Sequence, residues 1–161
     1  MFKRLAFVAF SIAVTTAFAL GAPPAGGMPP LPPQPKVRPA GMPAGAVKLS
    51  PCVATMGEHW ANLKDMPFGP LYGVYNGKIV FTEVMIPKKD FEQGKGWSNV
   101  LKPLPGHAID HVDIWYEPNG HEGYPVPHYD LHAFYVPESV NRAFCPKGMK
   151  VPGTVTGVIM K

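Results

Sequence analysis

Three polar side chains alternate along one short segment of the chain. The segment reads Pro-His-Tyr-Asp-Leu-His, so His128, Asp130 and His132 are spaced at i, i+2 and i+4. If this segment is a β-strand, its period of two places all three on one face. Two imidazoles and a carboxylate suit a transition metal, with Asp130 as a ligand or as an acceptor that orients a histidine ring. An exposed polar face would give the same pattern, but Phe134 and Val136 continue this face and indicate that it turns inward.

Two further side chains are candidates for the same centre. His59 lies in a Met-Gly-Glu-His-Trp segment. A histidine beside a tryptophan is more often a packed structural residue, so it becomes a ligand candidate only because of the His128 and His132 pair. Glu83 lies in an otherwise mostly apolar strand, where a buried carboxylate needs a cation, a metal or a proton. We expect Glu83 to be a fourth ligand or a catalytic general base, or else an outward residue of an edge strand.

The other histidines and the methionines carry a weaker signal. His107 and His121 fall in glycine-containing loops and are expected to be exposed rather than ligating, although His121 could lie at the mouth of a pocket. Met56, Met66 and Met85 could recruit copper, but scattered methionines usually pack cores. No serine lies in a Gly-x-Ser-x-Gly context and no phosphate-binding glycine motif is present, so nucleophilic and nucleotide chemistry find no support.

These residues lead to three hypotheses. The first is a domain that binds one transition metal, zinc or copper. The second is a metal-dependent enzyme, of hydrolase or lyase type, in which an open coordination position activates water. The third is a metal-free structural or small-molecule-binding barrel whose histidines are hydrogen-bonded in the interior. The expected partner is therefore a metal ion or a small molecule, and self-association into a homo-oligomer stays open.

Short runs of β-branched and aromatic residues, separated by turn signals, must position these side chains. The Asn76-Gly77 pair predicts a type I′ hairpin turn. We expect a mainly antiparallel β domain, a small barrel or sandwich with minor helices. The expected elements are strands at 71–75, 78–86, 109–117 and 126–136, one or two helical turns at 87–93 ended by Gly94, and a closing strand at 154–160.

The pairing of the strands at 109–117 and 126–136 decides whether another histidine joins the site. If Glu117 lies opposite Val126, His111 faces His132 and becomes a further metal-ligand candidate. A slip of one residue would move His111 to the other face of the sheet.

Cys52 and Cys145 are the only cysteines among the 161 residues. They predict a disulfide in an oxidising compartment, because their flanks lack the close cysteine spacing of a thiolate metal site. In the chain-entropy model, closing so long a loop contributes about 4 to 5 kcal/mol.

The composition divides the chain into three parts. Lys3 and Arg4 precede an apolar stretch ending in Ala-Phe-Ala, which indicates a signal peptide at 1–21 and export to the periplasm or the medium. The apolar stretch is shorter than the roughly 20 residues of a spanning helix, so we expect no permanent membrane anchor. Residues 22–51 are rich in proline, glycine and alanine and predict a disordered tether, followed by a β-rich domain at 52–161.

The net charge of +4 does not indicate nucleic-acid binding. All 11 acidic residues lie after Cys52, so the compact part is nearly neutral and the basic surplus belongs to the segments before it. The compact part has no basic stripe interleaved with aromatic residues, which binding to a phosphate backbone requires.

The last feature is a set of motifs: Cys52 and the segments at 56–60, 69–73, 81–85 and 127–132. Together they resemble a family of uncharacterised secreted bacterial domains, a domain of unknown function typified by a thermophile protein under sigma-E control. The resemblance covers about Cys52 to Cys145. It implies a β-rich exported domain with no established activity, and it implies that the Met-Gly-x-His-Trp and Pro-His-Tyr-Asp-x-His segments belong to one site.

Overall fold

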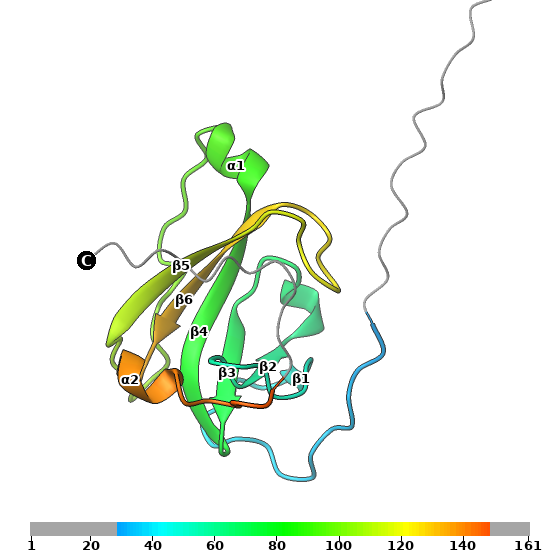
Figure 1. The fold of residues 1–161 in the computed structure, drawn as a ribbon, viewed down its shortest axis with the longest axis vertical. Coiled ribbons are helices and arrows are strands. Elements are labelled where there is room, and N and C mark those ends of the chain that lie inside the picture. Colours follow the sequence, from blue (N-terminus) through cyan, green and yellow to red (C-terminus); the bar gives the residue numbers. More distant parts are fainter. Residues whose placement is uncertain (1–28, 149–161) are drawn as a thin grey trace, which may run out of the picture.

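Six strands form one antiparallel sheet in the computed structural model, which describes residues 29–148 (Figure 1). Their order across the sheet is β1-β2-β3-β4-β6-β5. Within the described residues β1 and β5 are the two edges, so the sheet is not a closed barrel, and no second sheet faces it. The prediction of a mainly antiparallel β fold with minor helices is confirmed. The strands are β1 Val47–Lys48, β2 Glu58–Ala61, β3 Leu71–Tyr75, β4 Lys78–Pro87, β5 His111–Glu117 and β6 His128–Phe134.

The hairpin of β3 and β4 forms the middle of the sheet. Its turn residues Asn76 and Gly77 both have positive φ, 49° and 72°, as a type I′ turn requires. β4 pairs with β3 on one side and with β6 on the other. Because β4 is a central strand, the alternative that placed Glu83 on an edge strand is wrong.

In the described part of the chain, three short helices connect or follow the strands. A 3₁₀ helix at Leu63–Asp65 precedes β3, α1 at Lys88–Glu92 continues directly from β4, and α2 at Glu138–Asn141 follows β6 (Figure 1). The predicted helical turn at 87–93 is therefore confirmed, and Gly94 follows it with a φ of 68°.

The pairing of β5 with β6 differs from the predicted register by two residues. His111 lies opposite Phe134 rather than His132, and Glu117 lies opposite His128. The cause is the loop, in which an isolated bridge between His121 and Tyr124 closes a tight turn. Because the shift is an even number, His111 stays on the face that the prediction gave it.

The compact part begins before Cys52, which corrects the predicted tether at 22–51. Val47 and Lys48 pair with β2 as strand β1, and Met42 and Ala46 are buried against Trp60. Further back, the side chain of Gln34 hydrogen-bonds both the amide and the carbonyl of Lys48. The proline-rich composition predicted disorder, but composition does not show that the few apolar residues of this segment pack against one face of the sheet.

A disulfide joins Cys52 to Cys145, with the two Cα atoms 5.9 Å apart. The predicted bridge is confirmed, and it ties the segment before β2 to the segment after α2. No helix between residues 29 and 148 is long and apolar enough to cross a membrane. The predicted signal peptide at 1–21 and the predicted closing strand at 154–160 lie outside the described residues.

The two faces of the sheet are packed differently. One face carries a mostly apolar cluster that includes Trp60, Tyr72 and Val74. On the other face, Phe81 and Phe134 are completely buried, and buried polar side chains lie beside them. The site is built from six titratable side chains of this second face, which come from four strands. Five are buried and His59 is half-buried: His59, Glu83, Glu117, His128, Asp130 and His132.

Candidate metal centre

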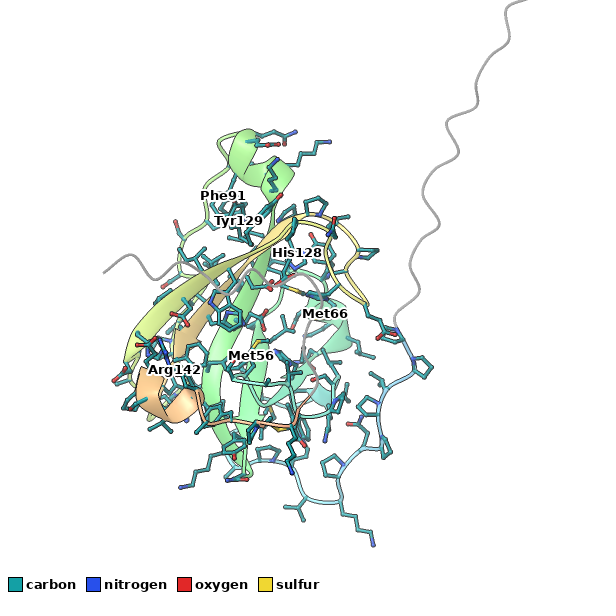
Figure 2. All side chains as sticks on the ribbon, viewed as in Figure 1. Met56, Met66, Phe91, His128, Tyr129 and Arg142 are labelled. Carbon is teal, nitrogen blue, oxygen red and sulfur yellow. A yellow bond between two sulfur atoms is a disulfide. The ribbon has the colours of Figure 1, made fainter. Side chains whose placement is uncertain are left out.

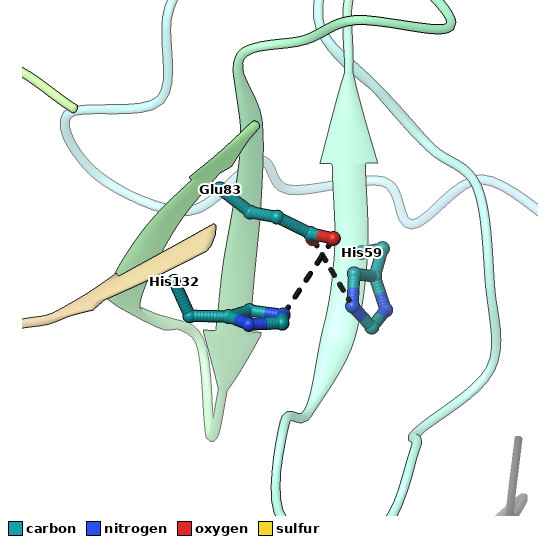
Figure 3. Close-up of side chains that lie close together, drawn as sticks. All are labelled: His59, Glu83 and His132. Carbon is teal, nitrogen blue, oxygen red and sulfur yellow. Dashed lines mark ion pairs between the residues drawn. The ribbon is translucent and has the colours of Figure 1, made fainter. Parts of the chain in front are cut away.

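His59, Glu83 and His132 converge from three strands on one point (Figure 3). Glu83 on β4 lies directly opposite His132 on β6. His59 on β2 is separated from β4 by β3, where its partner is Gly73. Since paired residues of an antiparallel sheet share a face, the register places all three side chains on the same side.

The carboxylate of Glu83 lies between the two imidazoles. Its Oε2 is 3.6 Å from Nε2 of His59, and its Oε1 is 3.6 Å from Nε2 of His132. Both distances are too long for a hydrogen bond. Two donor atoms bound to one ion, each about 2.1 Å from it at a tetrahedral angle, lie about 3.4 Å apart. The spacing therefore fits ligands that share a metal better than it fits direct hydrogen bonds.

Gly73 and Phe81 hold the two histidine rings in place. A Cβ on Gly73 would lie 2.0 Å from the Phe81 ring, so only glycine lets this ring lie over β3. The Phe81 ring packs edge-on against His59 at 5.6 Å and against His132 at 5.1 Å, measured between ring centroids. The aromatic side chain thus fixes the separation of the two candidate ligands.

The electrostatics keep both imidazoles neutral. Burial, with a smaller contribution from His132, lowers the pKa of His59 to about 3. Burial likewise lowers the pKa of His132 to about 4. Burial and the nearby charges of Asp130 and Glu117 raise the pKa of Glu83 well above its usual range. A bound cation would reverse this effect on Glu83, and the neutral histidines present lone pairs without first losing a proton.

Hydrogen bonding leaves Nε2 of His59 directed at Glu83. The hydroxyl of Ser50 donates to the Pro51 carbonyl at 2.9 Å and lies 3.1 Å from Nδ1 of His59, so Nδ1 donates to it. His132 is fully buried, and neither of its ring nitrogens has a hydrogen-bond partner between residues 29 and 148. A buried unpaired imidazole is unfavourable unless another ligand satisfies it.

A second group lies beside the first on the same face. His121, His128 and Asp130 also bring one potential ligand atom each within 4.8 Å of one another. His128 and Asp130 are buried on β6, and His121 comes from the β5–β6 loop (Figure 2, where His128 is labelled). Burial alone would lower the pKa of His128, but contacts with Asp130 and the Val126 carbonyl outweigh it and raise that pKa.

An apolar cavity of about 550 Å³ opens onto both groups. Its lining includes His59 and Glu83 of the first group and His121 and Asp130 of the second. Met56, Met66 and Met85 also line it. The three methionines, which are scattered in the sequence, therefore lie around the same cavity. Figure 2 labels Met56 and Met66 near the middle of the molecule.

The single centre predicted from the sequence is thus divided in two. His132 joins His59 and Glu83, whereas His128 and Asp130 join His121. The alternation of three polar residues could not reveal this, because one strand face can serve two neighbouring sites.

Two residues have roles that the sequence did not indicate. His111 belongs to neither group, since its Nδ1 contacts Asp110 at 3.0 Å and its ring stacks on Phe134. The two-residue register shift places it opposite Phe134 and away from His132, its predicted neighbour. Glu117, 2% exposed and also in the cavity lining, was missed, and its only signal was its even spacing from His111.

Comparisons with known proteins add the following. No known protein family matches the chain, and no curated protein matches it. A solved structure of a hypothetical protein from Thermus thermophilus is similar, with 24% identity and a TM-score of 0.48, covering 55% of this chain and 84% of that one. Similarity of this degree carries no functional argument, so the geometry of the site must carry the functional conclusion.

Proposed function

We propose that this protein binds one transition-metal ion, zinc or copper, through His59, Glu83 and His132. The observation that carries the proposal is the Glu83 carboxylate, held 3.6 Å from an Nε2 atom on either side. The fully buried His132, whose nitrogens have no hydrogen-bond partner among the described residues, supports it. The same observation speaks against a metal-free interior in which the histidines are merely hydrogen-bonded.

The ligand set and the cavity bear on the choice of metal. Two imidazoles and one carboxylate form a ligand set that zinc uses. Copper(II) generally binds such donors more tightly than zinc does. Met56, Met66 and Met85 add soft thioethers to the cavity lining, which would favour copper(I). Replacing the three methionines by leucine should weaken copper(I) binding and leave zinc binding unchanged if copper is the native metal.

Metal analysis of the purified protein tests the proposal. The wild type should retain a transition metal through gel filtration, and His59→Ala with His132→Ala should abolish binding at this group. The loss should exceed about 100-fold in affinity, because removing even a partner that only orients a ligand costs roughly 10- to 100-fold. His107→Ala is the control, since its ring packs on Tyr135 and belongs to neither group. Unchanged metal content in the double variant would overturn the proposal.

A metal-dependent hydrolase or lyase is the second candidate function. The observation that favours it is the cavity beside a group of only three protein ligands, because catalytic zinc sites keep one position open for water. Glu83 then acts as a ligand rather than as the predicted general base, and the proton goes to Glu117, one of the other carboxylates in the cavity lining. Hydrolysis of chromogenic esters by the zinc-loaded wild type, absent in Glu117→Gln, tests this candidate.

We also propose that the protein is exported to the periplasm or the medium. The disulfide between Cys52 and Cys145 supports an oxidising compartment. Cell fractionation followed by N-terminal sequencing should find a mature chain that starts near residue 22. An intact N-terminus in the cytoplasmic fraction would contradict export.

A further inference from the structure

We propose that His121, His128 and Asp130 form a second site for a divalent transition-metal ion, beside the first and open to the same cavity. This inference goes beyond the proposed function and uses none of its ligands. The three potential ligand atoms lie within 4.8 Å of one another.

Backbone carbonyls fix which nitrogen of each histidine is free to bind. Nδ1 of His128 lies 2.6 Å from the carbonyl oxygen of Val126, and Nδ1 of His121 lies 3.0 Å from that of Glu122. A carbonyl only accepts, so each Nδ1 carries the proton and donates. In the neutral rings, the lone pair is therefore on Nε2 in both cases, which is the arrangement that metal-binding histidines commonly have.

The contact between His128 and Asp130 needs a positive charge. Nε2 of His128 and Oδ1 of Asp130 are 3.0 Å apart, yet neither atom makes a well-aligned hydrogen bond within residues 29–148. Both side chains are buried, with 0% and 6% of their residues' surface exposed. Two lone pairs facing each other at 3.0 Å repel unless a proton or a metal ion lies between them.

His121 makes the metal the better explanation of the two. A proton shared by His128 and Asp130 would not require a third donor, but the His121 ring stands edge-on to His128 at 4.8 Å between ring centroids. It completes a set of two imidazoles and one carboxylate, the same donors as in the first group. The tight turn between His121 and Tyr124 holds the His121 ring beside His128, at the start of β6.

Zinc stoichiometry measured on single-group variants tests the second site. Wild-type chain is dialysed against buffered zinc, and the bound metal is counted per chain. We expect two ions for the wild type, one for Glu83→Gln, one for His121→Ala, and none for the two changes combined. His121 lies in a loop outside the six strands, so its replacement spares the sheet, and Asp130→Asn provides a second variant. Circular dichroism checks that each variant is folded, with His107→Ala as the control.

The outcomes separate this inference from the proposed function. One ion in the wild type, lost in Glu83→Gln and kept in His121→Ala and Asp130→Asn, overturns the second site and leaves the first standing. One ion that is lost in His121→Ala but kept in Glu83→Gln supports the second site and overturns the first. One ion lost in either variant means a single shared centre and also overturns the inference.

Discussion

The two histidine groups use the same donor types on one sheet face but are held in different ways. His59, Glu83 and His132 come from three strands, whereas His121 of the second group comes from a loop. In the first group the carboxylate stands 3.6 Å from each imidazole, and in the second the closest approach is 3.0 Å.

The protonation of the two groups differs accordingly. Burial lowers the pKa of His132 to about 4. On the same strand, four residues away, His128 has a raised pKa because its contacts with Asp130 and the Val126 carbonyl outweigh burial. In the first group the three strands hold the ligands apart, with no direct contact that would favour a proton, so burial keeps the rings of His59 and His132 neutral. In the second group His128 and Asp130 approach to 3.0 Å, and without a metal the carboxylate favours a proton on the imidazole. We therefore expect the first group to be the more rigid metal site.

The largest effect on this comparison should come from Gly73→Ala. The added Cβ would meet the Phe81 ring at 2.0 Å, and that ring contacts both His59 and His132. We expect a loss of about 1–3 kcal/mol in the free energy of unfolding, typical of overpacking, and weaker zinc binding at the first group only. Urea denaturation and zinc titration measure the two effects. Gly96→Ala is the control because no atom lies within 4 Å of its added Cβ, and equal losses in both variants would contradict the account.

Ser50→Ala should weaken the first group without touching the second. Ser50 Oγ accepts from Nδ1 of His59 and from its backbone amide, at 3.1 and 3.0 Å. Removing a partner that orients a metal ligand costs roughly 10- to 100-fold in affinity. The second group takes its ring acceptors from backbone carbonyls, so its affinity should not change. Competition with a zinc-chelating dye measures both, and an unchanged first affinity would show that Ser50 does not orient His59.

The metal-free protein should show a pH dependence that Glu83→Gln removes in part. Folding raises the pKa of Glu83 above its unfolded value of 4.5, so this group's stabilising contribution is present below pH 4.5 and is lost as pH rises through the folded pKa. His59 and His132 act in the opposite direction, since their lowered values remove stability as pH falls from 6.5 towards 4 and 3. Urea denaturation of EDTA-treated protein measures this. The free energy of unfolding of Glu83→Gln, relative to that of the wild type, should increase as pH rises above 4.5. A constant difference across pH would contradict the burial of an uncompensated Glu83.

The smallest effect is expected from His111→Ala. This ring lies on the same sheet face but pairs with Asp110 and stacks on Phe134. Zinc stoichiometry and affinity should equal those of the wild type within error. A lost ion would mean that the pairing of β5 and β6 differs from the one described.

Local patterns predicted more of the fold than of the site. The period of two and the Asn76-Gly77 turn were enough to predict the central hairpin, and the alternation at 128–132 was enough to predict an inward polar face. The division of ligands between two groups depends on which strands lie side by side, and no local pattern contains that information. His121 depends on a tight turn inside a loop, and strand β1 on a few apolar contacts within a proline-rich segment. Each feature that the sequence did not predict thus depends on a long-range contact or on the conformation of a loop.

Anomalous diffraction from crystals of the zinc-loaded protein tests the central claim most directly. Data collected on both sides of the zinc absorption edge locate the ion without reference to any assumed ligand. We predict a peak about 2.0–2.2 Å from Nε2 of His59, Nε2 of His132 and a carboxylate oxygen of Glu83. A fully loaded crystal with no peak between these three side chains would contradict the claim that they form a metal centre.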